Sequence, residues 1–254
     1  MSLFRDDLAS KPDIKVAVAT RKHNMCLNES SINPLEVISG ALQDTIKKVQ
    51  LNRYVSDVTP ALKKKLAEYV GDDIQPPQIL FGNGVDDLLY FLFTATRSTW
   101  GSYVLSLAPS YFDYQTYSGS VGLNICQIDF DQNFDFSVDK YLEKLSHPDC
   151  TLGILCNPNN PTGHMLSDEK IEAILKSTQK PILIDETYFE FSGKTYVGRL
   201  KDFPHLLISR SFSKSFSAAG LRFGYLIGSQ ENMVLLNRVI PVFNTSILTQ
   251  AIAL

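Results

Sequence analysis

Two short apolar runs, each followed at once by a polar loop, decide the fold. The first is Thr151-Leu-Gly-Ile-Leu-Cys156, which leads into Asn157-Pro-Asn-Asn-Pro-Thr-Gly163. The second is Pro181-Ile-Leu-Ile184, which leads into Asp185-Glu-Thr-Tyr188. Short uninterrupted apolar runs are typical of strands that are buried on both faces, as in a parallel sheet covered by helices. Ligands of open α/β sheets bind beyond the carboxyl ends of the strands, so these polar loops are candidate site segments.

The same alternation continues on both sides of these runs. Further strands are predicted at residues 78–81, 103–107, 123–128, 206–209 and 223–227. Helices are predicted at residues 35–50, 60–70, 86–96, 110–118, 137–145, 167–177 and 230–238, and the helix at 86–96 is apolar nearly all round, which indicates burial. Strand–helix–strand order predicts an open α/β fold.

Composition and charge exclude several other classes of protein. The 254 residues are 44% hydrophobic and 20% charged, as expected for one large or two small globular domains. The net charge of −3 and the lack of a long basic run argue against nucleic acid or an anionic membrane as partner. The sequence contains no uninterrupted run of 18 apolar residues, so no membrane-spanning helix is predicted.

Cysteine, histidine and the first residues indicate the compartment. The four cysteines form no CxxC pair and the four histidines no HExxH motif, so we expect no metal site. Acidic residues stand in Phe4-Arg-Asp-Asp-Leu8, where a signal peptide needs basic and then apolar residues. We therefore expect a cytoplasmic protein with reduced thiols.

Two further polar segments follow predicted strands, and each has two interpretations. Gly82-Asn-Gly-Val-Asp-Asp87 either presents backbone N–H groups to an anion or is an ordinary strand-to-helix turn. Ser209-Arg-Ser-Phe-Ser-Lys-Ser-Phe216, with Arg222 soon after, either binds phosphate and offers Lys214 as a nucleophilic amine or is a solvated basic loop.

The first two loops are equally open to two interpretations. The stiff 157–163 loop either holds an asparagine amide toward a ligand or is a turn whose asparagines bond only to backbone. The carboxylate of Asp185 either serves a cationic or protonated ligand or caps the next helix.

Taken together and in this order, the four segments resemble those of the class I/II aminotransferases, pyridoxal-phosphate (PLP) enzymes of fold type I. The chain is most similar to histidinol-phosphate aminotransferases, with further support from Asn52-Arg-Tyr54 and from Pro109-Ser-Tyr111-x-x-Tyr114. The resemblance implies a mostly parallel sheet of seven strands with helices on both faces. It implies an N-terminal arm at 1–28, a large PLP-binding domain at 29–245 and the start of a small C-terminal domain at 246–254.

The resemblance also implies a role for particular residues in binding the ring of the cofactor. Lys214 would form the Schiff base with PLP and then transfer protons. Asp185 would keep the pyridine nitrogen protonated, and Asn160 and Tyr188 would bond the phenolic oxygen O3′. Tyr111 would stack on the ring, unless it is a core aromatic.

A second group of residues is implied at the phosphate of the cofactor. The turn at 82–87 would contribute Gly84 and the backbone N–H groups of Val85 and Asp86. The loop after residue 209 would contribute the side chains of Ser211, Ser213 and Arg222. Val85 stands where the family usually has serine or alanine, and a backbone contact survives that change. Tyr54 would reach the phosphate of a neighbouring subunit, which implies a homodimer.

The implied reaction moves an amino group between an amino-phosphate such as L-histidinol phosphate and 2-oxoglutarate or glutamate, as in histidine biosynthesis. A threonine-phosphate type of decarboxylase, an aminotransferase for another amino acid and a non-catalytic PLP-binding or dimerisation module remain alternatives.

Two departures from the family pattern concern the substrate. The usual Asn-Glu-Asn-Pro is replaced by Asn28-Glu-Ser-Ser-Ile-Asn-Pro34. The family continues for roughly another hundred residues beyond the position of Leu254, a small domain's worth, and that part carries the arginine for the substrate's α-carboxylate. We therefore expect this chain to be a fragment.

Overall fold

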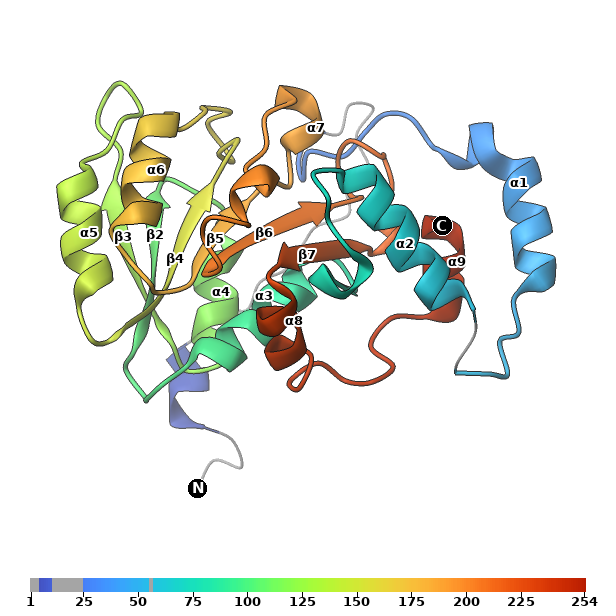
Figure 1. The fold of residues 1–254 in the computed structure, drawn as a ribbon, viewed down its shortest axis with the longest axis horizontal. Coiled ribbons are helices and arrows are strands. Elements are labelled where there is room, and N and C mark those ends of the chain that lie inside the picture. Colours follow the sequence, from blue (N-terminus) through green and yellow to red (C-terminus); the bar gives the residue numbers. More distant parts are fainter. Residues whose placement is uncertain (1–4, 11–24, 55–56) are drawn as a thin grey trace.

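The residues described by the computed structural model, 5–10, 25–54 and 57–254, contain one seven-stranded sheet in the order β1-β7-β6-β5-β4-β2-β3 (Figure 1). The strands are β1 (Ile79–Gly82), β2 (Tyr103–Ala108), β3 (Asn124–Asp129), β4 (Cys150–Cys156), β5 (Ile182–Asp185), β6 (Leu206–Ser211) and β7 (Gly224–Gly228). Only β7 runs antiparallel to its neighbours, β1 and β6, in this sheet of the described residues. The predicted mostly parallel α/β sheet is confirmed.

Helices cover both faces of the sheet. The α-helices are α1 (Leu35–Lys48), α2 (Val58–Val70), α3 (Val85–Thr96), α4 (Asp113–Ser120), α5 (Val138–Ser146), α6 (Asp168–Lys176), α7 (Phe189–Ser192), α8 (Gln230–Leu236) and α9 (Ile247–Ala253). Short 3₁₀ turns are η1 (Asp6–Ser10), η2 (Pro76–Gln78), η3 (Val197–Arg199) and η4 (Ala219–Leu221).

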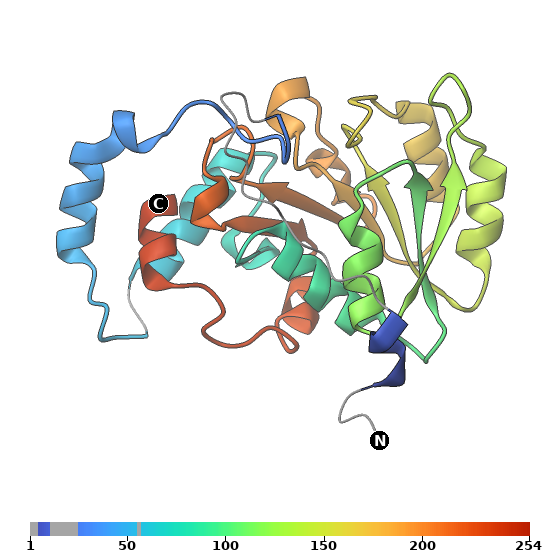
Figure 2. The ribbon, with the colours of Figure 1, turned by 180° about the vertical axis from the view of Figure 1, so that it is seen from behind.

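The two faces carry separate hydrophobic clusters because successive strand residues point in opposite directions. In β5, Ile182 and Ile184 join the cluster beneath α2, α5 and α6, and Leu183 joins the cluster beneath α3, α4 and α8. Figure 2 shows α3 and α4 from behind the sheet. This two-sided burial explains why the strands read as uninterrupted apolar runs.

Local signals placed the C-terminal end of α2 correctly and its start two residues late, and the expected burial of the next helix was only half right. Pro60 lies in the first turn of α2, and Gly71 ends that helix with a φ of +73°. In α3, Leu88, Leu89 and other residues on one side are buried, whereas Tyr90 is 42% exposed. The helix lies on one face of the sheet, so its outer side meets solvent despite its apolar sequence.

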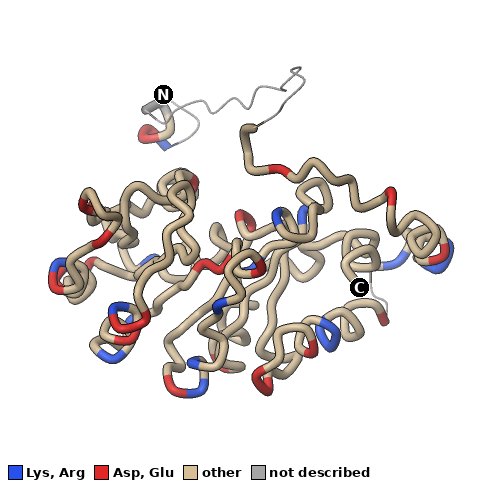
Figure 3. The backbone as a smooth tube through the Cα atoms, turned by 90° about the horizontal axis from the view of Figure 1, so that it is seen from above, with Lys and Arg blue, Asp and Glu red and all other residues tan. Residues whose placement is uncertain are grey.

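The periphery carries α1 and charges of both signs. Helix α1 has no buried residue among those described and lies at one end of the molecule, beside α9 (Figure 1). Lys and Arg positions are spread among Asp and Glu positions over the outer helices and loops (Figure 3). No helix in the described ranges has the length and apolar character needed to cross a membrane.

The predicted division into domains stays a prediction. Most of the proposed arm at 1–28 falls on residues 1–4 and 11–24, which lie outside the described residues. Helix α9, in the segment assigned to a second domain, contacts α2, and the Thr59 hydroxyl bonds the Gln250 side chain at 2.6 Å.

Candidate active site

A cavity of about 780 Å³ lies where the carboxyl ends of the parallel strands meet. Strand register brings Cys156 opposite Asp185 and Ser211 opposite Gly224, so the polar segments after several strands reach one edge of the sheet. Ten predicted site residues line this cavity: Val85, Asp86, Tyr111, Asn160, Asp185, Tyr188, Ser211, Ser213, Lys214 and Arg222.

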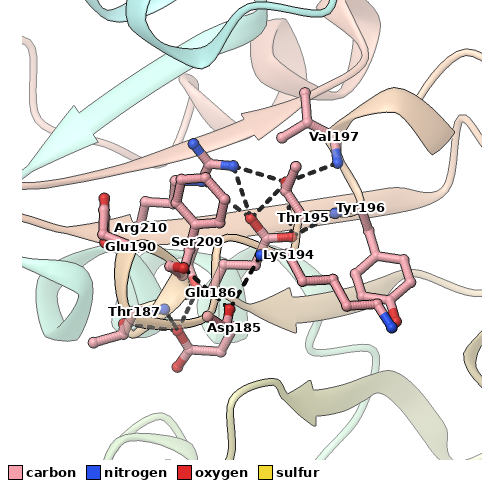
Figure 4. A network of polar contacts seen from close by, with 12 residues as sticks. Asp185, Glu186, Thr187, Glu190, Lys194, Thr195, Tyr196, Val197, Ser209 and Arg210 are labelled. Carbon is pink, nitrogen blue, oxygen red and sulfur yellow. Dashed lines mark hydrogen bonds and ion pairs between the residues drawn. The ribbon is translucent and has the colours of Figure 1, made fainter. Parts of the chain in front are cut away.

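Asp185 is buried at the end of β5 and is held by four donors. The Thr187 and Ser209 hydroxyls each donate to Oδ1 at 2.8 Å, and the backbone N–H of Thr187 donates to the same oxygen at 3.1 Å (Figure 4). The Tyr114 hydroxyl donates to Oδ2 at 2.7 Å. The bonds to Thr187 form a local turn, but the N-cap of α7 is Tyr188 and has no side-chain cap, so the interpretation of Asp185 as a helix cap is wrong and its carboxylate lines the cavity. The four hydrogen bonds to Asp185 replace those that its carboxylate would make to water if it were exposed.

Lys214 and Tyr188 both meet the segment that precedes α1. The Lys214 amine donates to the backbone carbonyl of Leu27 at 2.6 Å, and the Asn28 amide donates to the Tyr188 hydroxyl at 2.9 Å. Burial lowers the pKa of Lys214, and the nearby Arg222 lowers it further against the opposing charges of Asp86 and Glu29. A lowered pKa increases the fraction of neutral amine, the form that acts as a nucleophile.

Another part of the cavity is organised by the side chain of Asp86, for which only the backbone N–H had a predicted role. Its carboxylate accepts a hydrogen bond from Arg222 at 2.9 Å and another from the Tyr111 hydroxyl at 3.0 Å. Tyr111 is therefore a cavity residue, with its hydroxyl anchored to Asp86 beside the start of α3. Two acidic residues in the first turn of α3 were the available signal.

Glycine is required beside Arg222. Gly84 has a φ of +88°, and a Cβ atom there would lie 2.6 Å from Nη2 of Arg222. The first N–H groups of a helix lack intrahelical partners, so Val85 and Asp86 can present theirs to an anion. Ser211 accepts a hydrogen bond from the backbone N–H of Ser213 at 3.1 Å, which orders the adjacent turn.

The asparagine-rich loop uses two of its asparagines to fix its own position and places the third in the cavity. Asn157 accepts from the backbone N–H of Leu166 at 2.9 Å. Asn159 accepts from the Ser110 hydroxyl at 2.8 Å, so the interpretation that the asparagines bond only to backbone is wrong. Asn160 lines the cavity instead. The loop is thus a braced turn that carries one residue toward a ligand.

The prediction that Arg210 belongs to a polar loop after a strand is wrong. It lies inside β6, is buried, and donates to the Glu186 carboxylate through Nε at 3.0 Å and Nη2 at 2.9 Å (Figure 4). The Thr195 hydroxyl and the backbone N–H of Tyr196 bond the same carboxylate. Neither Glu186 nor Arg210 lines the cavity, so this pair braces the site from outside.

Tyr54 lies apart from the other predicted site residues. Its side chain is 78% exposed and stacks on Phe243 with ring centroids 4.5 Å apart. It is not among the residues that line the cavity.

The chemistry of the lining residues fits PLP. A half-buried amine, a buried carboxylate and an amide with a phenol match a carbonyl carbon, a ring nitrogen and a phenolic oxygen, respectively. The α3 N-terminus, the two serines and Arg222 match a phosphate. Gly84, with its φ of +88°, lets the chain enter α3 against the Arg222 guanidinium, although Gly84 itself is not among the residues that line the cavity.

Comparisons with known proteins point the same way. A family model described as aminotransferase class I and II matches residues 20–254. The histidinol-phosphate aminotransferase of Caldanaerobacter subterraneus subsp. tengcongensis is 32% identical over 253 residues, which cover 100% of this chain and 71% of that protein. The corresponding protein of Thermoanaerobacter sp. strain X514 is 31% identical over the same shares.

Solved structures share the fold. The histidinol-phosphate aminotransferase from Clostridium acetobutylicum superposes with a TM-score of 0.76 at 28% identity, covering 89% of this chain and 67% of that one. The enzyme from Sinorhizobium meliloti in complex with pyridoxal-5′-phosphate gives a TM-score of 0.79 at 22% identity, covering 89% and 61%.

Proposed function

Because this chain belongs to the class I and II aminotransferases, which depend on PLP, we propose that it transfers an amino group between L-histidinol phosphate, or a similar amino-phosphate, and 2-oxoglutarate or glutamate. The observation that carries the proposal is the meeting of Lys214, Asp185 and Arg222 in one cavity. The names of the similar proteins support the choice of substrate, since the relatives at 31–32% identity are histidinol-phosphate aminotransferases.

PLP, when bound, supplies an electron-poor ring that accepts the electron pair released as the substrate's α-carbon loses its proton. In our proposal the Lys214 amine holds the cofactor covalently and then moves that proton. Asp185 holds a proton on the ring nitrogen, because a buried carboxylate stabilises the adjacent positive charge. Asn160 and Tyr188 bind the ring oxygen, and Tyr111 packs against the ring face.

The phosphate end of the proposed site is built from charge and backbone. Arg222 offers a planar guanidinium that pairs with phosphate oxygens, and the Ser211 and Ser213 hydroxyls can donate to the same group. The N–H groups of Val85 and Asp86 lie at the positive end of the α3 dipole. Arg222 is paired with Asp86 in this structure, so phosphate would share the guanidinium with that carboxylate.

We also propose a homodimer and a cytoplasmic location. The exposed, stacked Tyr54 lies outside the cavity of its own chain, which supports a role at the phosphate of a second subunit. The thiols of Cys126, Cys150 and Cys156 are free, which suits a reducing compartment. Sedimentation equilibrium of the holoprotein tests the dimer.

A single-turnover experiment tests the reaction. The full-length holoprotein is mixed with L-histidinol phosphate, O-phospho-L-threonine or glutamate, without an oxo acid, and the cofactor spectrum and products are followed. We expect conversion of the cofactor to its amine form with release of the oxo product, fastest with L-histidinol phosphate. Release of carbon dioxide would identify a decarboxylase instead. No spectral change with any donor would support a non-catalytic module and overturn the proposal.

A further inference from the structure

We propose that Tyr114 is a positioning residue for Asp185, which directs Oδ2 of that carboxylate, rather than Oδ1, toward the ring nitrogen of the cofactor. The inference rests on the proposed role of Asp185. It adds a residue that the motif comparison left without a role and names the oxygen that acts.

The two carboxylate oxygens of Asp185 differ in the number of hydrogen bonds that they already accept. A carboxylate offers about four lone-pair sites, two on each oxygen. Oδ1 of Asp185 accepts three bonds, two from Thr187 and one from Ser209. Among the described residues, Oδ2 accepts one bond, from the Tyr114 hydroxyl. Oδ2 therefore retains the capacity for a further donor, and a protonated ring nitrogen is such a donor.

Tyr114 is itself held rigidly. It lies in α4 and is 1% exposed, within the hydrophobic cluster beneath α3, α4 and α8. Its ring meets that of Tyr111 edge to face, with centroids 5.4 Å apart and planes at 85°. One buried side chain therefore supports both the residue proposed to pack on the cofactor ring and the residue proposed to bind its nitrogen.

The bond also affects where the proton resides. Donation to a carboxylate favours its anionic form. Burial raises the pKa of Tyr114 well above its ordinary value, so the hydroxyl remains a donor at the pH of any assay. With this donor in place, the negative charge of the carboxylate is stabilised, and the shared proton stays on the ring nitrogen. Without it, Asp185 competes more strongly for that proton.

The test measures the protonation of the ring nitrogen directly, by ¹⁵N NMR of holoprotein carrying ring-labelled PLP. Tyr114→Phe is compared with the unsubstituted protein, Asp185→Asn and Tyr141→Phe. Tyr141 is a matched control, because it is equally buried but lies in the other hydrophobic cluster and donates to the backbone carbonyl of Ile154 at 3.3 Å. We expect the Tyr114→Phe signal to move toward the unprotonated position found for Asp185→Asn.

The control Tyr141→Phe should keep the signal of the unsubstituted protein. Turnover of Tyr114→Phe should fall roughly tenfold to a hundredfold with KM nearly unchanged, the loss expected for one hydrogen bond to a charged group. A Tyr114→Phe signal identical to that of the unsubstituted protein would overturn the inference alone. A protonated nitrogen in Asp185→Asn would instead reject the proposed role of Asp185.

A crystal structure of the unsubstituted holoprotein gives a second test that does not depend on the folding of any variant. The ring nitrogen should lie within hydrogen-bonding distance of Oδ2 of Asp185, with the Tyr114 hydroxyl still on that oxygen. A ring nitrogen bonded to Oδ1 would contradict the proposal.

Discussion

The side-chain amine of Lys214 donates a hydrogen bond of 2.6 Å to the backbone carbonyl of Leu27, a residue far away in the sequence. The next residue, Asn28, bonds the Tyr188 hydroxyl. Leu27 and Asn28 both have positive φ angles, of 66° and 50°, so the chain turns sharply where it meets the cavity. The segment before α1 thus contacts two of the groups to which we assign chemistry.

The lowered pKa of Lys214 predicts how cofactor attachment depends on pH. Burial disfavours the ammonium form, so half of the amine is neutral at a pH below 10.5, the ordinary pKa of lysine. The folded protein binds this proton more weakly than the unfolded chain. Burying the charged amine therefore lowers the free energy of unfolding. This loss is fully present below the pKa of Lys214 in the folded protein and disappears as the pH rises through 10.5, the pKa in the unfolded chain. The rate of attachment to apoprotein should have its midpoint below pH 10.5, and a midpoint at or above that pH would contradict the assignment.

Arg222→Lys should weaken cofactor binding. Lysine keeps the charge but lacks the planar fork that pairs with two phosphate oxygens. The dissociation constant of PLP, measured by fluorescence titration of apoprotein, should rise roughly tenfold, about 1.4 kcal/mol. Arg199→Lys is the matched control, since Arg199 is also a half-exposed arginine paired with a carboxylate, Glu172, outside the cavity. Equal increases in the dissociation constant for the two substitutions would show that Arg222 does not bind the phosphate.

Glu186→Gln should destabilise the fold far more than a comparable surface change. It leaves the Arg210 guanidinium buried without its counter-charge, which costs about 3–5 kcal/mol. Glu172→Gln breaks the corresponding bond to Arg199 at the surface, where water compensates, and should cost much less. Urea denaturation of both variants measures the difference. Similar midpoints would show that the buried pair does not brace β5 against β6.

Tyr54→Phe tests the contribution of a second subunit. If the Tyr54 hydroxyl donates to the phosphate in a neighbouring subunit, its loss should weaken PLP binding by roughly threefold to tenfold, the value of one hydrogen bond. Tyr90→Phe, another exposed tyrosine, should leave binding unchanged. A dissociation constant for Tyr54→Phe equal to that of Tyr90→Phe would reject the cross-subunit role.

Sequence patterns predicted the sheet because its strands are defined locally. Residues 182–184 are apolar since both faces of their strand are covered, and the polar Asp185 that follows them must emerge at the edge of the sheet. The same reasoning placed Asn160 and Lys214 after strands, and both line the cavity.

Contacts between distant segments could not be predicted from periodicity. The bond between Tyr114 and Asp185 joins residues 71 positions apart, and that between Asp86 and Arg222 joins residues 136 apart. Arg210 was assigned to a polar loop because its neighbours are hydroxyl residues. A buried arginine needs a buried acid, and only the pairing of β5 with β6 shows that Glu186 supplies it.

The central claim is that Lys214 carries PLP, and the most direct test is to reduce the holoprotein with borohydride and map the labelled peptide by mass spectrometry. Lys214→Ala is compared with Lys194→Ala, a lysine at the surface that pairs with Asp168. We expect one reduced cofactor adduct, on Lys214, which persists in Lys194→Ala and disappears in Lys214→Ala. An adduct of equal yield in Lys214→Ala would contradict the account.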